Sequence, residues 1–241
     1  MTGLAKRVLA IGAHPDDIEM TCAGTLAHFR HAGSAVHLAV ACRGDKGGSA
    51  ASAEELAARR EQEARRSAEL LAAPISFLGL ADAEVRDEPR TRLLFLNLLR
   101  QTQPELILTH DPQDYHEDHR QVSGLVVIAS WFAASPGQGT DLPPLPQPPA
   151  VVFMDNLAGI GFEPTHLVDV TDTFALRQQM LACHASQIAR PDSGMPQLRE
   201  LSETLARLRG FQCGVRYAEG FRPCLAFGRR RPEPLLPGGA S

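Results

Sequence analysis

The sequence predicts an α/β protein with a Rossmann-like, doubly wound and mostly parallel sheet that carries helices on both faces. Three observations support this prediction. Short runs that are apolar at every position alternate with longer amphipathic segments, as expected when strands are buried between helices. The order strand, helix, strand repeats from the N-terminus onward. Clusters of histidine and aspartate follow two of the apolar runs, where sheets of this class form their sites.

The N-terminal third of the chain supplies two strands and two helices. Residues 8–13 are continuously apolar, which is typical of a strand buried on both faces. A helix is expected over 22–31, because Gly33 provides a stop signal. A second strand is expected at 35–42. The segment 54–72 is rich in Ala, Glu, Arg and Leu, which favours a long helix.

The middle of the chain repeats this pattern. A third strand is expected at 75–80, a helix at 91–101 and a fourth strand at 106–109. The fourth strand runs directly into His110. A helix over 117–134 follows the polar cluster, so the cluster lies between a strand and a helix.

A proline-rich segment over 135–149 is predicted to be a loop or a lid, since long irregular loops in compact domains are often functional. Beyond it, strands are expected at 151–154 and 167–170, helices at 171–188 and 196–209, and a flexible tail at 232–241.

Composition excludes several classes of function. The chain has 241 residues and reads as one domain over 1–241. A net charge of -4 argues against a nucleic-acid partner. The five cysteines form no CxxC pair, which argues against a disulfide framework or a cysteine-built metal site. No apolar run approaches the roughly 18 residues of a membrane span, and the N-terminal run is too short for a signal peptide, so a cytoplasmic protein without membrane contact is expected.

Two polar clusters carry the chemistry. His14, Asp16 and Asp17 follow the first predicted strand, and the segment 110–119 (HDPQDYHEDH) follows the fourth. A catalytic zinc site usually takes three protein ligands from His, Asp or Glu and leaves one position for water. His14 and Asp17 can reach one ion from a strand-to-helix turn, and His119 is a natural third ligand. Asp16 would then lie beside the metal, where a carboxylate can accept a proton from water.

Each of these residues also has a plainer interpretation. A lone histidine at a strand end is more often a hydrogen-bonded loop residue than a ligand, and Asp16 or Asp17 could cap a helix. Capping does not account for two dense groups at the carboxyl ends of two strands, which therefore favour a metal site. The turn GAHPDD also lacks the GxGxxG pattern of a dinucleotide-binding turn.

The clusters resemble the motifs of a known family. AHPDD and YHEDH are similar to the signature of the LmbE/PIG-L family of zinc-dependent N-acetylglucosamine deacetylases. ACRGDKGG, REQEARRSAELL, VDVTD and HASQ resemble further family segments, so the resemblance covers most of the chain. The stretch RGFQCGVRYAEGFRP looks closest to the bacillithiol-biosynthesis branch, whose members deacetylate N-acetylglucosaminyl malate.

The resemblance implies a role for each residue of the two clusters. His14, Asp17 and His119 correspond to the zinc ligands, and Asp16 corresponds to the general base. His116 corresponds to the histidine that stabilises the oxyanion, expected here in its protonated form. Asp118, between the two histidines, is expected to orient His116 by a hydrogen bond. Whether Asp16 or His116 protonates the leaving amine stays open.

Two residues outside the clusters are candidates for substrate binding. Arg60 matches an arginine of the family's helix and is expected to bind substrate hydroxyls or a carboxylate, with a surface salt bridge to Glu63 as the alternative. Tyr217 is expected to line the pocket, with a place in the core as the alternative. The resemblance also implies Zn²⁺ as the cofactor, with Fe²⁺, Mn²⁺ or Co²⁺ as alternatives, and a homo-oligomer, often a hexamer.

The sequence therefore predicts an enzyme that removes an acetyl group from an N-acetylated amino sugar, a small-molecule substrate. Another N-acyl sugar, such as a chitooligosaccharide, an antibiotic glycoside or a thiol conjugate, is the alternative within enzymes. A non-catalytic metal-binding or sugar-binding protein is the alternative from another class, against which the presence of Asp16 and His116 argues. Ile18 stands where many family members have an acidic residue directly after the two aspartates. At this position the sequence departs from the thiol-sugar members that carry the acidic residue.

Overall fold

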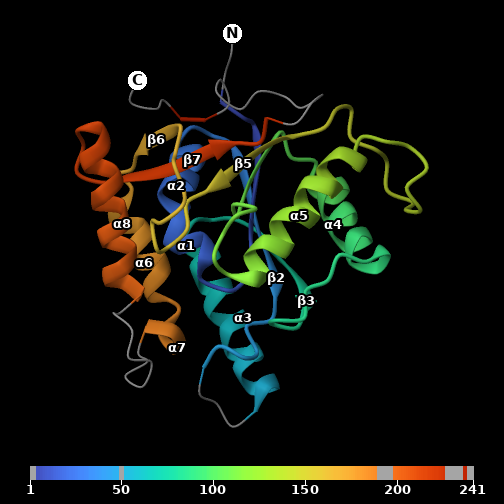
Figure 1. Cartoon of the computed structure of the whole chain (residues 1–241), viewed down its shortest axis with the longest axis horizontal. Coiled ribbons are helices and arrows are strands. Elements are labelled where there is room, and N and C mark those ends of the chain that lie inside the picture. Colours follow the sequence, from blue (N-terminus) through green and yellow to red (C-terminus); the bar gives the residue numbers. More distant parts are fainter. Residues whose placement is uncertain (1–3, 49–51, 189–197, 226–235, 238–241) are drawn as a thin grey trace.

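A seven-stranded sheet forms the centre of the computed structural model, which describes residues 4–48, 52–188, 198–225 and 236–237 (Figure 1). The strands are Arg7–Gly12 (β1), Ala35–Cys42 (β2), Ile75–Leu80 (β3), Leu106–Thr109 (β4), Ala150–Met154 (β5), His166–Asp169 (β6) and Ala218–Pro223 (β7). The helices are Asp17–Thr21 (α1), Ala23–His31 (α2), Ala53–Leu70 (α3), Pro89–Thr102 (α4), Glu117–Phe132 (α5), Phe174–Ala182 (α6), Ala185–Ile188 (α7) and Leu198–Cys213 (α8).

Most of the sheet is parallel. The strands lie in the order β3-β2-β1-β4-β5-β7-β6. The pairs β1–β2, β2–β3, β1–β4 and β4–β5 are parallel, and only β7 runs antiparallel to its neighbours β5 and β6 among the described strands. The sheet therefore grows outward from β1 in one direction and from β4 in the other, which confirms the predicted doubly wound arrangement.

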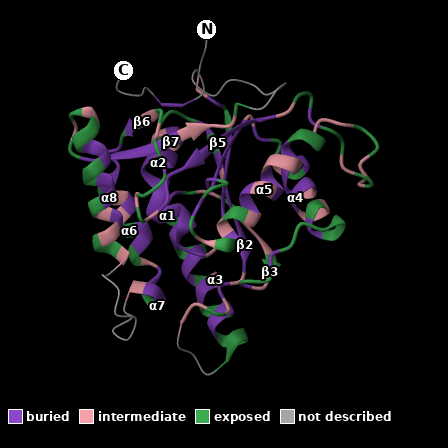
Figure 2. Ribbon diagram, viewed as in Figure 1, coloured by how far each residue is buried: buried purple, intermediate pink, exposed green. Residues whose placement is uncertain are grey.

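Helices cover both faces of the sheet, and alternate residues of each central strand enter different cores. Val8 and Ala10 of β1 belong to a hydrophobic cluster with residues of α2, α6 and α8. Leu9 and Ile11 belong to a second cluster with residues of α4 and α5. Figure 2 shows the central strands buried between the two helical layers. Their continuously apolar sequence reflects this burial on both faces.

The C-terminal half departs from the predicted pattern in two places. The strand β7 was not predicted, because its sequence AEGFRP contains Glu, Gly and Pro, which are depleted in strands. It is buried nevertheless, and Glu219 lies 3.1 Å from Arg177 Nε. The helix expected over 171–188 is divided into α6 and α7. No Gly or Pro marks the break, where the chain places the fully buried His184 3.1 Å from a carboxylate oxygen of Glu19.

The proline-rich segment 135–149 is an irregular loop, as predicted, but it does not cover the carboxyl ends of β1 and β4. It lies beside α4 and α5 (Figure 1, yellow-green). Arg100 of α4 donates to the carbonyl oxygens of Ser135 and Leu142 at 2.6 and 2.7 Å. These bonds and the buried Leu145 fix the loop against the helices. The prediction of a lid is therefore wrong for the site described below.

The C-terminal end is predicted to be a flexible tail over 232–241. Of this segment only residues 236 and 237 are described, and both are buried; the rest of the predicted tail lies outside the described residues. Within the described part of the chain, no helix combines the length and hydrophobicity that crossing a bilayer requires.

Candidate active site

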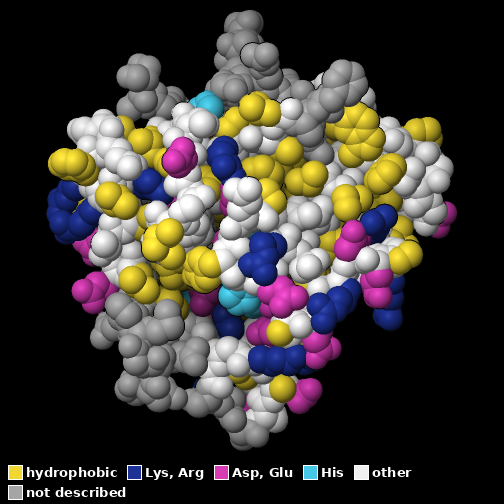
Figure 3. Space-filling view, viewed as in Figure 1, with side chains coloured by type: hydrophobic (Ala, Val, Ile, Leu, Met, Phe, Trp, Pro, Cys, Tyr) yellow, Lys and Arg dark blue, Asp and Glu magenta, His cyan; other side chains and the backbone are white. Residues whose placement is uncertain are grey.

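The candidate active site is a cavity of about 480 Å³ at the carboxyl ends of β1 and β4. These strands are neighbours, and the sheet extends from them toward opposite edges, which is where doubly wound sheets form their sites. The turn after β1 contributes residues 13–17, and residues 110–119 follow β4. Histidine, acidic and basic side chains gather near the middle of the face shown in Figure 3. The structure thus brings the two predicted clusters together.

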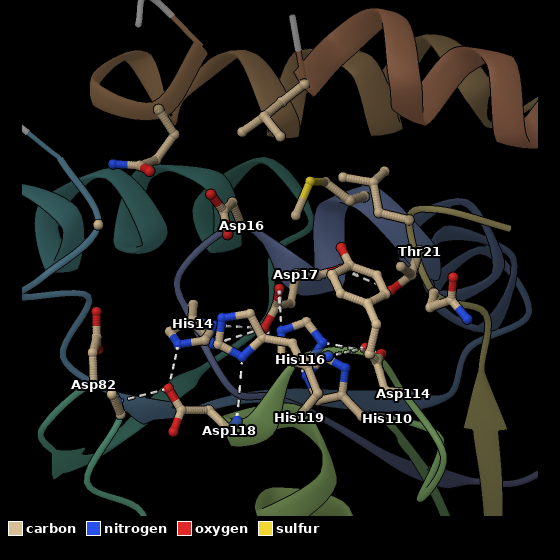
Figure 4. Close-up of a pocket in the computed structure, with 18 of the residues that line it drawn as sticks. His14, Asp16, Asp17, Thr21, Asp82, His110, Asp114, His116, Asp118 and His119 are labelled. Carbon is tan, nitrogen blue, oxygen red and sulfur yellow. Dashed lines mark hydrogen bonds and ion pairs between the residues drawn. The ribbon is translucent and has the colours of Figure 1, made fainter. Parts of the chain in front are cut away.

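Asp17 lies between His14 and His119, the other two predicted metal ligands (Figure 4). Its Oδ1 is 3.4 Å from His119 Nε2, and its Oδ2 is 3.6 Å from His14 Nδ1. Oδ2 also accepts a 2.7 Å hydrogen bond from the backbone N–H of His14, which fixes the carboxylate in the turn before α1. Asp17 is 3% exposed, so these polar atoms face one another away from bulk solvent.

The second ring nitrogen of each predicted histidine ligand is held by another carboxylate. His14 Nε2 lies 3.1 Å from Asp118 Oδ2, and His119 Nδ1 lies 3.0 Å from Asp114 Oδ2. These contacts place a proton on His14 Nε2 and on His119 Nδ1, which leaves His14 Nδ1 and His119 Nε2 as the ring atoms that can bind a cation once they lose their protons. Carboxylate partners of this kind are common behind metal-binding histidines.

The electrostatics of the cluster favour positive charge. Burial alone would raise the pKa of Asp17, but His119 and His110 hold it well below its ordinary value. Burial would lower the pKa of His14, but its bonds to Asp118 and Asp17 raise that pKa to about 10. Burial would also lower the pKa of His119, but Asp17 and Asp114 raise that pKa to about 9. The donor set therefore suits a cation.

His119 belongs to two groups of three residues that could hold a metal ion. Within each group, the three donor atoms lie within 4.8 Å of one another. One group adds His14 and His116, and the other adds Asp17 and His110. His110 was not predicted to have a role. Its Nε2 accepts a 2.8 Å hydrogen bond from the Ala13 backbone N–H, and its ring stacks on His119 at 3.9 Å. His110 therefore supports the ligand cluster, and its place next to β4 was the signal for it in the sequence.

Removal of the Asp114 carboxylate is expected to weaken metal binding by about 10- to 100-fold, the usual cost of losing a partner behind a ligand. Asp114→Ala frees the His119 ring to rotate and leaves the proton free to occupy Nε2. Titration of the metal-free variant against a chromophoric chelator measures the affinity. Asp87→Ala is the control, because Asp87 is an exposed aspartate that pairs with Arg92. Equal affinity in Asp114→Ala and wild type would contradict the orienting role.

Asp16 has the properties expected of a general base. It lies directly before α1 with φ 119° and ψ -23°, a left-handed conformation that is rare for a residue with a Cβ. Burial raises its pKa to about 6, and the positive charge of Arg60 opposes this rise. A carboxylate whose pKa approaches neutrality can both accept and return a proton. Asp16 lines the cavity together with His14, Asp17 and His116.

His116 lies over the ligand cluster but is not set up to be protonated. Its ring centroid is 4.5 Å from that of His119 and 4.8 Å from that of His14. Its Nδ1 accepts a 3.2 Å hydrogen bond from the Asp118 backbone N–H, which assigns the proton to Nε2. Burial and the neighbouring histidines His119 and His14 lower its pKa. The lowered pKa favours a neutral His116 ring with an N–H donor over the predicted protonated form.

Asp118 has a different partner from the predicted one. Its Oδ2 lies 3.1 Å from His14 Nε2 and accepts a 2.8 Å hydrogen bond from the Ala83 backbone N–H. Its contact with His116 is made by the backbone N–H. The Asp118 side chain therefore orients His14, and the expectation that its carboxylate holds His116 is corrected.

The structure separates the two predicted substrate-binding residues. Arg60 borders the cavity but is 3% exposed, and it donates to Pro15 and Asp16 rather than to Glu63. The predicted surface salt bridge is therefore absent between these described residues. Tyr217 lies elsewhere.

The Tyr217 ring stacks on Phe174 with centroids 3.6 Å apart, and its hydroxyl donates to Glu203 at 3.2 Å. It is 6% exposed and is not among the described residues that line the cavity. The expectation that Tyr217 binds substrate is thus corrected to the alternative, a place in the core.

Several cavity residues had no signal in the sequence, because they come from separate loops and form no local motif. They include Asp82, Asp155 and Asn156, whereas Gln187, which also lines the cavity, ends the HASQ segment. Asp82 shows how these loops are joined: its two carboxylate oxygens accept from the backbone N–H groups of Gly44 and Lys46 at 2.8 and 3.1 Å. These bonds tie the loop after β3 to the loop after β2.

Comparisons with known proteins agree with this geometry. Residues 9–130 match the family profile described as GlcNAc-PI de-N-acetylase (PIG-L). A diacetylchitobiose deacetylase of Thermococcus kodakarensis is 30% identical over 90% of this chain and 82% of that protein. A 4-oxalmesaconate hydratase of Pseudomonas putida is 27% identical over 76% of this chain and 74% of that protein. The structure of an N,N'-diacetylchitobiose deacetylase from Pyrococcus horikoshii, in complex with an inhibitor, matches with a TM-score of 0.81 and 29% identity over 91% of this chain and 84% of that one.

Proposed function

Because the chain belongs to the PIG-L family of GlcNAc-PI de-N-acetylases, we propose that it is a metal-dependent hydrolase that removes the N-acetyl group from an N-acetylglucosamine-containing small molecule. One observation carries this proposal: Asp17 lies between His14 and His119, each held by a second carboxylate, with the buried Asp16 beside them. Binding of a metal or a sugar alone would require neither Asp16 nor the N–H of His116.

His14 Nδ1, Asp17 and His119 Nε2 are the atoms proposed to hold the cation. Zn²⁺ is the proposed ion, because two imidazoles and one carboxylate are a common set of ligands for catalytic zinc; Fe²⁺, Mn²⁺ and Co²⁺ suit the same donors. When bound, such an ion polarises a carbonyl oxygen and lowers the pKa of water.

Side chains of this protein carry out the remaining steps of the proposed reaction. Asp16 accepts the proton of the attacking water, whose oxygen forms the new bond to the acetyl carbonyl carbon. The Nε2–H of His116 donates to the carbonyl oxygen as that oxygen gains negative charge. Asp16 then returns the proton to the leaving nitrogen as the C–N bond breaks. Asp16 is assigned this step because the lowered pKa of His116 leaves less of its ring in the protonated form that could donate to an amine. The products are acetate and a free amino sugar.

The charges around the cavity favour a neutral aglycone. Lys46 and Arg60 are the permanent cations among the described lining residues, and protein groups engage both. Lys46 Nζ lies 2.6 Å from Glu84 and donates to the Asp82 carbonyl oxygen at 2.7 Å. A malate group would bring two carboxylates toward this acidic cavity. Diacetylchitobiose is therefore our first choice of substrate, and N-acetylglucosaminyl malate, the substrate of the bacillithiol branch, stays a prediction.

Hydration of a carbon–carbon double bond is the second candidate reaction, because of the similarity to the Pseudomonas putida hydratase. A metal site with an adjacent base serves either reaction. The charge argument weighs against it, since the substrate named for that relative is an anionic acid. The two reactions differ in what they release, which makes them separable by product.

A substrate panel tests the proposed function. Metal-loaded protein is incubated with diacetylchitobiose, N-acetylglucosaminyl malate, N-acetylglucosaminyl inositol, an N-acetylated antibiotic glycoside and 4-oxalmesaconate, and primary amine release and ultraviolet absorbance are followed. We expect amine release with diacetylchitobiose and no loss of the absorbance of 4-oxalmesaconate. Loss of that absorbance without amine release from any sugar would favour the hydratase.

Several sequence-based expectations about the surroundings of the enzyme stay predictions. These are a homo-oligomer, often a hexamer in the family that the sequence resembles, a cytoplasmic location, and the absence of nucleic-acid and membrane partners. Light scattering of the purified chain measures the oligomeric state directly, and a monomer would contradict the first of them.

A further inference from the structure

Arg60 of α3 lies directly behind Asp16, the general base of the proposed function. Its Nη2 donates to the Pro15 carbonyl oxygen at 2.7 Å and lies 3.3 Å from Asp16 Oδ2. Its Nη1 donates to the Gly44 carbonyl oxygen at 3.4 Å. The side chains of Arg60 and Asp16 are 4% and 6% exposed. The guanidinium group therefore contacts the turn that carries the base, and both of its terminal nitrogens donate to protein oxygens.

The Gly-rich connection after β2 makes room for this guanidinium group. Gly44 has a φ of +72°, and a Cβ there would lie 2.7 Å from both Cδ and Nε of Arg60. A Cβ on Gly47 would lie 2.9 Å from Arg60 Nη1. A side chain at either position would force Arg60 to move. The placement of Arg60 thus explains Gly44 and Gly47 of the sequence ACRGDKGG, whereas a Cβ on the third glycine, Gly48, would meet Leu56.

Asp16 requires such support because of its backbone conformation. With φ 119° it occupies a region that residues with a Cβ rarely adopt, and such conformations persist only where the surroundings fix them. The Asp16 side chain makes no capping hydrogen bond to α1. Among the described contacts, Arg60 is the side chain that holds both the Pro15 carbonyl group and the Asp16 carboxylate.

We propose that Arg60 is a positioning residue that fixes the turn at residues 15–16 and thereby the direction of the Asp16 carboxylate, instead of binding the sugar. A sugar hydroxyl or carboxylate at Nη1 or Nη2 would compete with the bonds that these nitrogens already make to Gly44, Pro15 and Asp16. The proposal rests on the proposed function, because it takes Asp16 as the base. It replaces the substrate-binding role that the sequence suggested for Arg60.

Steady-state kinetics of metal-loaded, full-length variants separate the two roles. In Arg60→Ala, kcat for diacetylchitobiose is expected to fall by about 100-fold, since a small displacement of a reacting group has an effect of this size. KM is expected to stay unchanged. Arg60→Lys is expected to recover only part of kcat, because an ammonium group lacks the planar arrangement of donors. Arg59→Ala is the matched control. Arg59 is the next residue of α3, its side chain is exposed, and it pairs with Glu55 at 3.0 Å. A raised KM with unchanged kcat in Arg60→Ala would overturn the proposal.

Hydrogen exchange gives a second test that requires no substrate. The backbone amides of residues 14–20 are expected to exchange faster in Arg60→Ala and Arg60→Lys than in wild type, with no change in Arg59→Ala. Unchanged exchange in both Arg60 variants would overturn the positioning role even if the enzyme is a deacetylase. If wild type deacetylates none of the sugars, the proposed function fails, and the exchange measurement still decides whether Arg60 holds the turn.

Discussion

Asp16→Asn is expected to retain its metal and its fold and to lose about 10²- to 10⁴-fold in kcat, the range for removal of a general base. The amide has the shape of the carboxylate and its oxygen can still accept from Arg60, but it cannot take a proton from water. Stopped assays of amine release measure kcat, and atomic absorption measures the metal bound to each chain.

The contacts of Asp16 allow this variant to separate loss of the base from loss of the metal. The side chain lies among Arg60, Pro15 and the cavity, and the atoms proposed to bind the metal belong to other residues, His14, Asp17 and His119. Asp87→Asn, at an exposed position, serves as the control. Full activity of Asp16→Asn would remove Asp16 from the mechanism, whereas loss of metal together with activity would make Asp16 a ligand.

His119→Ala is expected to lose the metal and to lower kcat/KM by about 1,000-fold or more, because the ion contributes several kcal/mol to charge stabilisation. His119 belongs to two of the three groups of donor atoms among the described residues that could hold an ion. The third group, His14, Cys42 and Asp82, is a poor substitute, because burial raises the pKa of the Cys42 thiol and the Asp82 carboxylate already accepts from two backbone N–H groups. Metal content after dialysis and kcat/KM for amine release are measured on the same preparation.

His116→Ala is the matched comparison for this prediction. It is expected to keep the metal and to lose about 10²- to 10³-fold in kcat, as for removal of one donor to a developing oxyanion. If His116→Ala loses the metal while His119→Ala keeps it, the ion is bound by a different set of residues, and the division between ligands and oxyanion donor would have to be redrawn.

The position of the site could be predicted from the sequence because two strong signals coincide. Strands buried on both faces have continuously apolar sequences, so the ends of β1 and β4 were identified to within a residue or two. His14, Asp17 and His119 follow those ends, and the carboxyl ends of neighbouring parallel strands meet at one edge of a sheet. The pairing of β1 with β4 follows from the doubly wound order and brings the residues together.

The partners of these residues could not be predicted, because they depend on which loops meet in space. Asp118 is next to His119 in the sequence, yet its carboxylate contacts His14 and the Ala83 backbone, which come from other strand ends. Arg60 reaches Asp16 from the middle of α3. Spacing along one helix carries no information about such contacts.

The strand β7 was missed for a related reason. Its sequence has weak strand propensity, and the strand forms because it completes the pairing between β5 and β6. Glu219, in the middle of it, accepts from the backbone N–H groups of Gly24 and Thr25 at 3.0 and 2.8 Å and lies beside Arg177. A buried carboxylate that finds all its partners in distant segments has no signature in the local sequence.

The central claim, a metal-dependent N-deacetylase site, is tested most directly by titrating metal-stripped protein with Zn²⁺ and measuring acetate and primary amine released from diacetylchitobiose at each occupancy. The account predicts no turnover without metal, equal amounts of the two products, and a rate that rises with occupancy until one ion is bound per chain. Full activity of the stripped protein, or one ion per chain without release of either product, would contradict it.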